Sequence, residues 1–346
     1  MSKTVFVLGA GSSQEAKLPV GSELKKHIAS SLDIWFEDFR QTRGDRAITA
    51  ALSLAAAPSR DIGPFQQAAW RIRDAMPQAI SIDHYIDAHS GDSQVEICGK
   101  LAIVRSILEA EAKSSINANS STVNPSIHFE EIENTWFNPF FRLLTEDCRK
   151  ADIEKRISSV ALIVFNYDRC IEHYLYYALQ RYYAISDRDA ADLLRKMDIF
   201  HPYGRVGSLP WLDPINAVEF GGTPDPRLLF TLSGQIKTFT EGTNAASSDI
   251  LKIRDLMTDA NKIVFLGFAF HRLNLDLLLP IPGSSGQNVP CPIIASALGI
   301  SVPDTEHIAR DLISRWGGKR KASLQIRSGF SCARLFSEHW RSLSLV

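Results

Sequence analysis

The chain has 346 residues, of which 45% are hydrophobic and 22% are charged, values close to those of average globular proteins. Lysine and arginine total 38 against 39 aspartates and glutamates, so the formal net charge is -1. This balance excludes the strong basic excess that accompanies nucleic-acid binding, and we expect no direct nucleic-acid contact. The basic run 315–321 is expected to be a solvated loop.

The cysteines and the N-terminus bear on compartment and metal binding. Five cysteines are scattered along the chain, and no two form a C-x-x-C pair, so neither a disulfide framework nor a structural zinc site is expected. The apolar run near the N-terminus ends in glycine after about five residues, which is too short for a signal peptide or a membrane helix. We expect a cytoplasmic protein with no membrane segment and no metal.

The N-terminal half divides into a strand, a helix and a long helical stretch. Thr4–Leu8 is an apolar run followed by Gly-Ala-Gly, which predicts a buried parallel strand that enters a tight turn. A helix is expected to begin at Glu23 with Ser22 as its cap. From about 38 to 157 only helical patterns are found, which predicts a helical insertion without strands at 45–56, 65–76, 95–115 and 129–150.

Beyond the insertion, predicted strands alternate with predicted helices. Strands are expected at 160–165, 199–200, 228–232, 263–266, 293–296 and 324–326. Helices are expected at 169–183, 247–259, 274–279, 307–316 and 331–343. The alternation predicts an α/β fold with a Rossmann-like, doubly wound, mostly parallel sheet. The sheet would be built from 1–35 and 158–346, in a single domain spanning 1–346.

Three apolar strands, at 4–8, 160–165 and 263–266, are followed at once by small or polar residues. Ligands of doubly wound sheets bind at such strand ends. The first is followed by Gly9, Ala10, Gly11, Ser12 and Ser13. Glycines there let the backbone approach a pyrophosphate, whose charge the next helix would bind. A plain strand-to-helix turn would use the same residues, so both interpretations stay open.

Two further segments carry polar groups at strand ends. Asn166 and Asp168 follow the apolar run 160–165 and can face one cleft, although Asp168 can equally cap the next helix. His201 follows a short strand and precedes a loop rich in glycine and proline, where a histidine can serve as a base near neutral pH.

The order of these pieces resembles the sirtuin-like domains of bacterial anti-phage defence. The resemblance rests on G-A-G-S-S at 9–13, L-P at 18–19, N-Y-D at 166–168, H-x-x-G at 201–204 and G-F-A-F-H-R-L-N at 267–274. Such domains cleave NAD to nicotinamide and ADP-ribose. Because the chain lacks the two C-x-x-C pairs of deacylating sirtuins, protein deacylation is not expected.

The resemblance also implies roles for individual residues. Gly9, Ala10, Gly11, Ser12 and Ser13 would hold the pyrophosphate and the adjoining ribose. Asn166 would orient the nicotinamide ribose and the attacking water, Asp168 would lie by the nicotinamide, and His201 would be the general base. The adenosine side would be lined by Gly267, Phe268 and Asn274.

An NAD hydrolase of this kind needs control, and the resemblance implies self-assembly into a homo-oligomer or a partner chain such as a HerA-type ATPase or an Argonaute-like protein. Three alternatives remain open: a non-catalytic module that senses NAD or ADP-ribose, an ADP-ribosyl or acyl-group transferase, and a structural assembly protein. Replacing Asn166 or His201 with alanine is expected to abolish cleavage and to leave the fold intact.

Overall fold

The computed structural model describes residues 3–59, 61–118, 125–238, 241, 248–279, 291–315 and 324–346. Of the basic run expected to be a loop, all but Arg315 lies outside these residues. Within the described part of the chain, no helix is both long and apolar enough to cross a membrane.

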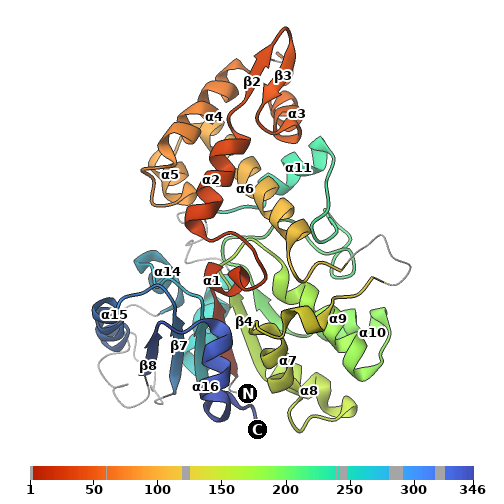
Figure 1. Ribbon diagram of the computed structural model, residues 1–346, viewed down its shortest axis with the longest axis vertical. Coiled ribbons are helices and arrows are strands. Elements are labelled where there is room, and N and C mark those ends of the chain that lie inside the picture. Colours follow the sequence, from red (N-terminus) through yellow and green to blue (C-terminus); the bar gives the residue numbers. More distant parts are fainter. Residues whose placement is uncertain are drawn as a thin grey trace.

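A six-stranded parallel sheet forms the centre of the molecule (Figure 1). Its strands are β1 (Thr4–Leu8), β4 (Val160–Val164), β5 (Asp198–Phe200), β6 (Lys262–Leu266), β7 (Ile293–Ala297) and β8 (Leu324–Ser328). They lie in the order β5-β4-β1-β6-β7-β8, so successive strands extend first to one side of β1 and then to the other. This is the strand order of a Rossmann-like fold, and the predicted α/β class is confirmed.

Helices cover both faces of the sheet, which explains why its strands are apolar along their whole length. Val5 and Val7 of β1 point to one face, and Phe6 and Leu8 point to the other; all four are buried. The first face packs against α13 (Ser248–Asp259), α14 (Arg272–Leu278) and α15 (Val302–Arg315). The second packs against α7 (Phe137–Thr145), α8 (Ile153–Ser158), α9 (Cys170–Tyr183), α10 (Asp187–Arg195) and α16 (Cys332–Leu343).

A group of helices, which we call the cap, lies beyond the carboxyl ends of the strands (Figure 1). It comprises α2 (Gly21–Ser31), the hairpin β2 (Trp35–Glu37) and β3 (Arg40–Arg43), α3 (Arg46–Ala55), α4 (Gly63–Ala75), α5 (Ile82–Ala88), α6 (Ser93–Lys113) and α11 (Pro226–Ser233). The stretch predicted as one helical insertion, about 38–157, therefore contributes to two parts of the molecule. Its first helices belong to the cap, whereas α7 and α8 pack on the sheet. The apolar core of the cap is continuous with that of the first sheet face.

A buried ion pair joins the cap to the rest of the molecule. Arg169, which precedes α9, and Glu111 of α6 are both almost inaccessible to solvent. The guanidinium donates two hydrogen bonds to the carboxylate, from Nε (3.1 Å) and from Nη2 (2.5 Å). It also donates to the carbonyl of Val218 at 2.6 Å, and Glu111 accepts from the Gly221 amide at 3.0 Å. The two buried charges therefore neutralise each other, and they also provide hydrogen-bond partners for several backbone groups of the 206–222 loop.

The structure corrects three predictions about local elements. The insertion does contain strands, because Asp38 and Phe39 adopt positive φ angles and close the β2–β3 hairpin. The expected strand at 228–232 is helix α11, which begins where Asp225 accepts hydrogen bonds from the next backbone amides and Pro226 takes the first helical position. Helix α2 begins at Gly21, so Ser22 does not cap it.

Candidate functional site

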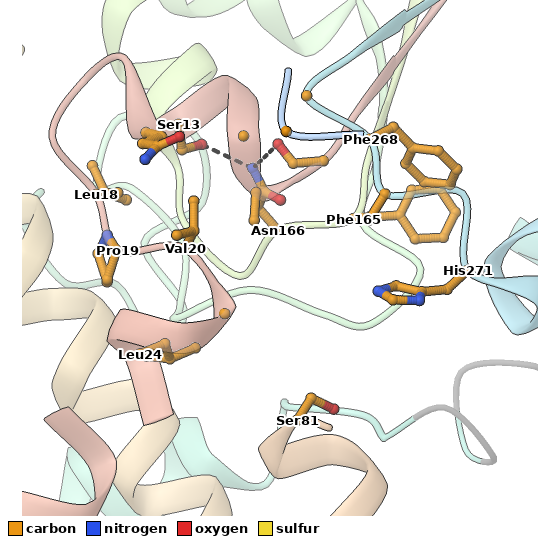
Figure 2. A pocket seen from close by; sticks show the side chains of 18 of the residues that line it. Ser13, Leu18, Pro19, Val20, Leu24, Ser81, Phe165, Asn166, Phe268 and His271 are labelled. Atoms are coloured by element: carbon orange, nitrogen blue, oxygen red, sulfur yellow. Dashed lines mark hydrogen bonds between the residues drawn. The ribbon is translucent and has the colours of Figure 1, made fainter. Parts of the chain in front are cut away.

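A cavity of about 860 Å³ lies between the carboxyl ends of the central strands and the cap. Its floor is formed by the turns after β1, β4, β6 and β7, and its opposite wall by residues of α2, α5 and α6. Figure 2 shows Ser13, Asn166 and Phe268 on the sheet side, with Leu24 and Ser81 facing them from the cap. The cavity lies where the strand order reverses at β1, the position at which doubly wound sheets bind ligands.

Most of the predicted site residues meet at this cavity although they lie far apart in the sequence. Those that line it are Gly9, Ala10, Gly11, Ser13, Asn166, Asp168, Gly267, Phe268 and Asn274. Ser12 and His201 do not line it. The Ser12 hydroxyl instead donates to the Gly9 carbonyl at 2.8 Å, inside the turn.

The glycines of the first turn are required by close packing against the turn after β6. The Gly11 amide donates to the carbonyl of Gly267 at 3.0 Å. A Cβ on Gly9 would lie 2.6 Å from that same carbonyl oxygen, and a Cβ on Gly11 would lie 2.9 Å from the Gly267 Cα atom. The Gly9 amide also donates within the protein, to the Leu266 carbonyl at 3.0 Å. Because neither position has room for a Cβ, these glycines have a structural role whether or not a pyrophosphate binds beside them.

Replacing Gly267 with alanine is expected to lower the free energy of unfolding by at least about 2 kcal/mol. Its φ angle is +58°, and a Cβ there would lie 2.1 Å from the Ser12 nitrogen. Gly329 is the matched control, because its φ angle is +74° but nothing lies within 4 Å of its added Cβ. Urea unfolding of both variants measures the difference, and equal losses would contradict the close packing of the two turns.

Asn166 is held in place by its side-chain amide. The Nδ2 group donates to the Gly9 carbonyl at 3.1 Å and to the Ser13 hydroxyl at 2.8 Å (Figure 2). The side-chain oxygen takes part in neither bond. The strand ends of β1 and β4 therefore fix the orientation of this carboxamide at the cavity wall, as a group that positions a ligand requires.

Asp168 lies beside Asn166 in a nearly inaccessible position. Burial raises the pKa of its carboxyl, although hydrogen bonds from Cys170 and Ser13 lower that pKa in part. The Cys170 amide, at the start of α9, donates to Oδ1 at 3.1 Å. Arg169, not Asp168, is the cap residue of α9, but Asp168 accepts from the first amide of the helix and lines the cavity as well.

His201 lies next to Asn166 but faces away from the cavity. Its Nδ1 is 3.2 Å from the backbone carbonyl oxygen of Asn166, and its Nε2 is 2.8 Å from Oε1 of Glu172. Both ring nitrogens therefore lie against oxygen atoms of the protein, and neither is directed at the cavity. The contact with the Asn166 carbonyl places the ring behind the segment that carries Asn166.

The partner of His201 is a buried, ionised carboxylate. Burial alone would raise the pKa of Glu172, but the charge and hydrogen bond of His201, together with the Arg205 guanidinium, lower it to about 2. Its Oε2 atom has no hydrogen-bond partner among the described residues. The negative charge is therefore held mainly by His201 and Arg205.

The pairing of Glu172 with His201 and Arg205 predicts that the free energy of unfolding falls at acid pH. A carboxyl whose pKa falls on folding stabilises the protein fully above its ordinary value of 4.5, and this contribution disappears as the pH falls toward the folded value of about 2. The loss between these limits is expected to be roughly 3 kcal/mol. Urea unfolding from pH 6 to pH 3 is expected to show about 2 kcal/mol of this loss. The same pH dependence in Glu172→Gln would contradict the assignment.

Several groups at the cavity were not predicted from the sequence. The Tyr167 hydroxyl donates to Oδ1 of Asp83, and the Tyr203 hydroxyl donates to Oδ1 of Asn274 at 2.6 Å. His271 also lines the cavity (Figure 2), and desolvation lowers its pKa. Tyr167 was within reach of prediction because it lies inside the N-Y-D segment. Asp83 had no distinguishing neighbours in the sequence.

No protein-family model matches the chain, and no curated protein matches it. Among the described residues, no group of three or more histidine, cysteine, aspartate or glutamate side chains is arranged to hold a metal ion. The similarity to sirtuin-like domains therefore rests on the segments quoted above.

Proposed function

We propose that the protein binds NAD in this cavity and hydrolyses the bond between nicotinamide and ribose. The observation that carries the proposal is that segments 9–13, 166–168 and 267–274, which carry the sirtuin-like motifs, line one cavity at the reversal point of a Rossmann-like sheet. A cavity of about 860 Å³ falls within the range of small-molecule sites.

The chemistry needed is compatible with the groups present. Cleavage of the bond leaves an oxocarbenium-like ribose, so the site must orient the sugar, favour positive charge and admit one water. Asn166 supplies a fixed carboxamide, and Asp83 and Asp168 supply carboxyl groups. Gly9, Gly11 and Ser13 would lie beside the pyrophosphate, with Gly267, Phe268 and Asn274 toward the adenosine.

Incubation of the purified protein with NAD tests the proposal. Chromatography is expected to show nicotinamide and free ADP-ribose in equal amounts. A modified acceptor detected by mass spectrometry in place of free ADP-ribose would indicate a transferase. The absence of any NAD binding in calorimetry would reject the nucleotide site itself.

One observation favours a second candidate, a module that senses NAD or ADP-ribose without cleaving it. The residue expected to be the base, His201, does not line the cavity. Tight binding of NAD by calorimetry with no release of nicotinamide would support the sensor and exclude the hydrolase.

The biological setting proposed is anti-phage defence by depletion of cytoplasmic NAD. Since an unregulated NAD hydrolase would harm its own cell, we propose control by homo-oligomer assembly or by a partner such as a HerA-type ATPase or an Argonaute-like protein. Turnover measured across protein concentrations with light scattering tests the first route. Equal specific activity in every assembly state would reject it.

A further inference from the structure

We propose that Asp83, which the cap brings to the cavity, is the general base that activates the attacking water. This inference rests on the proposed cleavage of NAD. It assigns a catalytic residue to the cap, whereas the motif residues expected to take part in catalysis, Asn166, Asp168 and His201, follow strands of the sheet.

The geometry places Asp83 directly opposite the N-Y-D segment. Asp83 lies in the first turn of α5, whose cap residue Ser81 accepts a hydrogen bond from the His84 amide at 3.2 Å. The Tyr167 hydroxyl, from the segment after β4, donates to Oδ1 of Asp83. This bond joins the Asp83 carboxyl to the segment that also carries Asn166 and Asp168, and all three residues line the cavity. The second oxygen, Oδ2, takes no part in it.

The other acidic groups at the cavity are committed to backbone amides. Glu15 accepts from the Trp136 amide at 2.8 Å with one oxygen and from the Ala333 amide at 3.0 Å with the other. Asp168 accepts from the Cys170 amide at the start of α9. His201 does not line the cavity, and its two ring nitrogens lie against the Asn166 carbonyl and Glu172. Asp83 also accepts from its own backbone amide, but it differs from these groups in its bond from the Tyr167 hydroxyl, which joins it to the N-Y-D segment.

The step balances without a further reactant. The water oxygen forms a bond to C1′ of the nicotinamide ribose, and one water proton passes to the Asp83 carboxylate. The electron pair of the broken C1′–N bond returns to the pyridinium ring, which leaves as neutral nicotinamide. Because this leaving group needs no proton, one base is sufficient. Asp83 then releases its proton to solvent.

The surroundings of Asp83 suit this role. Burial raises the pKa of its carboxyl, and the hydrogen bond from Tyr167 lowers that pKa in part. Among the described residues, the other titratable groups that act on Asp83 are Asp87, His84 and Tyr203. A carboxylate with a raised pKa is a stronger base, and general-base catalysis contributes about 10²- to 10⁴-fold to a rate.

The test compares full-length variants for nicotinamide release, NAD affinity and melting temperature. Asp83→Asn is expected to lower kcat by about 10²-fold or more with unchanged NAD affinity and melting temperature. Asp74→Asn, which alters an exposed carboxylate on α4 of the same cap, is expected to keep the wild-type rate. Tyr167→Phe removes the bond that lowers the Asp83 pKa, so the acidic limb of its kcat/KM profile is expected to move to higher pH.

Each contrary result has a distinct meaning. An inactive wild-type protein would overturn the proposed function and this inference with it. An active Asp83→Asn beside an active wild type would overturn only the role of Asp83. Loss of NAD affinity in Asp83→Asn would make the residue a binding group. If His271→Gln lost turnover and Asp83→Asn kept it, His271 would be the general base and the assignment to Asp83 would be overturned.

Discussion

Replacing Arg169 with methionine is expected to lower the free energy of unfolding by about 3 to 5 kcal/mol. The change removes the positive partner of Glu111, which is fully buried and cannot regain water around its charge. It also removes the donors to the Val218 and Glu219 carbonyls. Urea unfolding at neutral pH measures the loss.

The control for this prediction is Lys196→Met, which breaks an exposed ion pair with Glu154 and is expected to cost below about 1 kcal/mol. Replacing Glu111 and Arg169 together with apolar residues is expected to recover only part of the loss. The Gly221 amide and the loop carbonyls would still lack partners. A loss no greater than that of the control would refute the structural role of the buried pair.

Replacing Asn166 with alanine is expected to lower NAD turnover by about 10²- to 10³-fold. The carboxamide is the group that the turn after β1 holds in one orientation, and nothing in alanine can position a ribose or a water. The stability cost is expected to be about 1 to 2 kcal/mol, because the Gly9 carbonyl keeps its bonds from Ser12. Initial rates of nicotinamide release and the melting temperature measure both effects.

Asn138→Ala is the matched control. Like Asn166, this asparagine donates to a backbone carbonyl, that of Phe129, and it also accepts from the Tyr174 hydroxyl. It does not line the cavity. It is expected to lose stability and keep its activity. His201→Ala is a poor substitute, since it leaves the buried Glu172 charge without its main partner. Equal rates in Asn166→Ala and wild type would remove Asn166 from the mechanism.

The sheet could be predicted from the sequence because its inner strands are buried on both faces. Thr4–Leu8, Val160–Val164 and Lys262–Leu266 have few or no polar residues, and each is followed by residues typical of a strand end. The hairpin β2–β3 was missed because its turn is Asp38-Phe39, whereas glycine or asparagine usually supplies the positive φ angles. Helix α11 was missed because an apolar run of five residues does not distinguish a strand from a helix.

The residues of the candidate site could be predicted where they directly follow a strand of the sheet, and not elsewhere. Asn166, Asp168 and Gly267 follow strands, so their convergence follows from the topology of the sheet. The position of Asp83 depends on how the cap folds back over these ends, and its contact with Tyr167 joins residues 84 positions apart. The orientation of His201 depends on Glu172, a residue of α9 that no motif marks.

The continuous apolar core of cap and sheet has a consequence for how the chain can be divided. Val5 and Val7 of β1 belong to the same cluster as Ile72 and Leu101 of the cap helices. Excision of the cap would therefore uncover apolar side chains that water cannot solvate favourably, and the shortened protein would aggregate. Cap and sheet are expected to melt in one cooperative transition and to resist limited proteolysis as a single body.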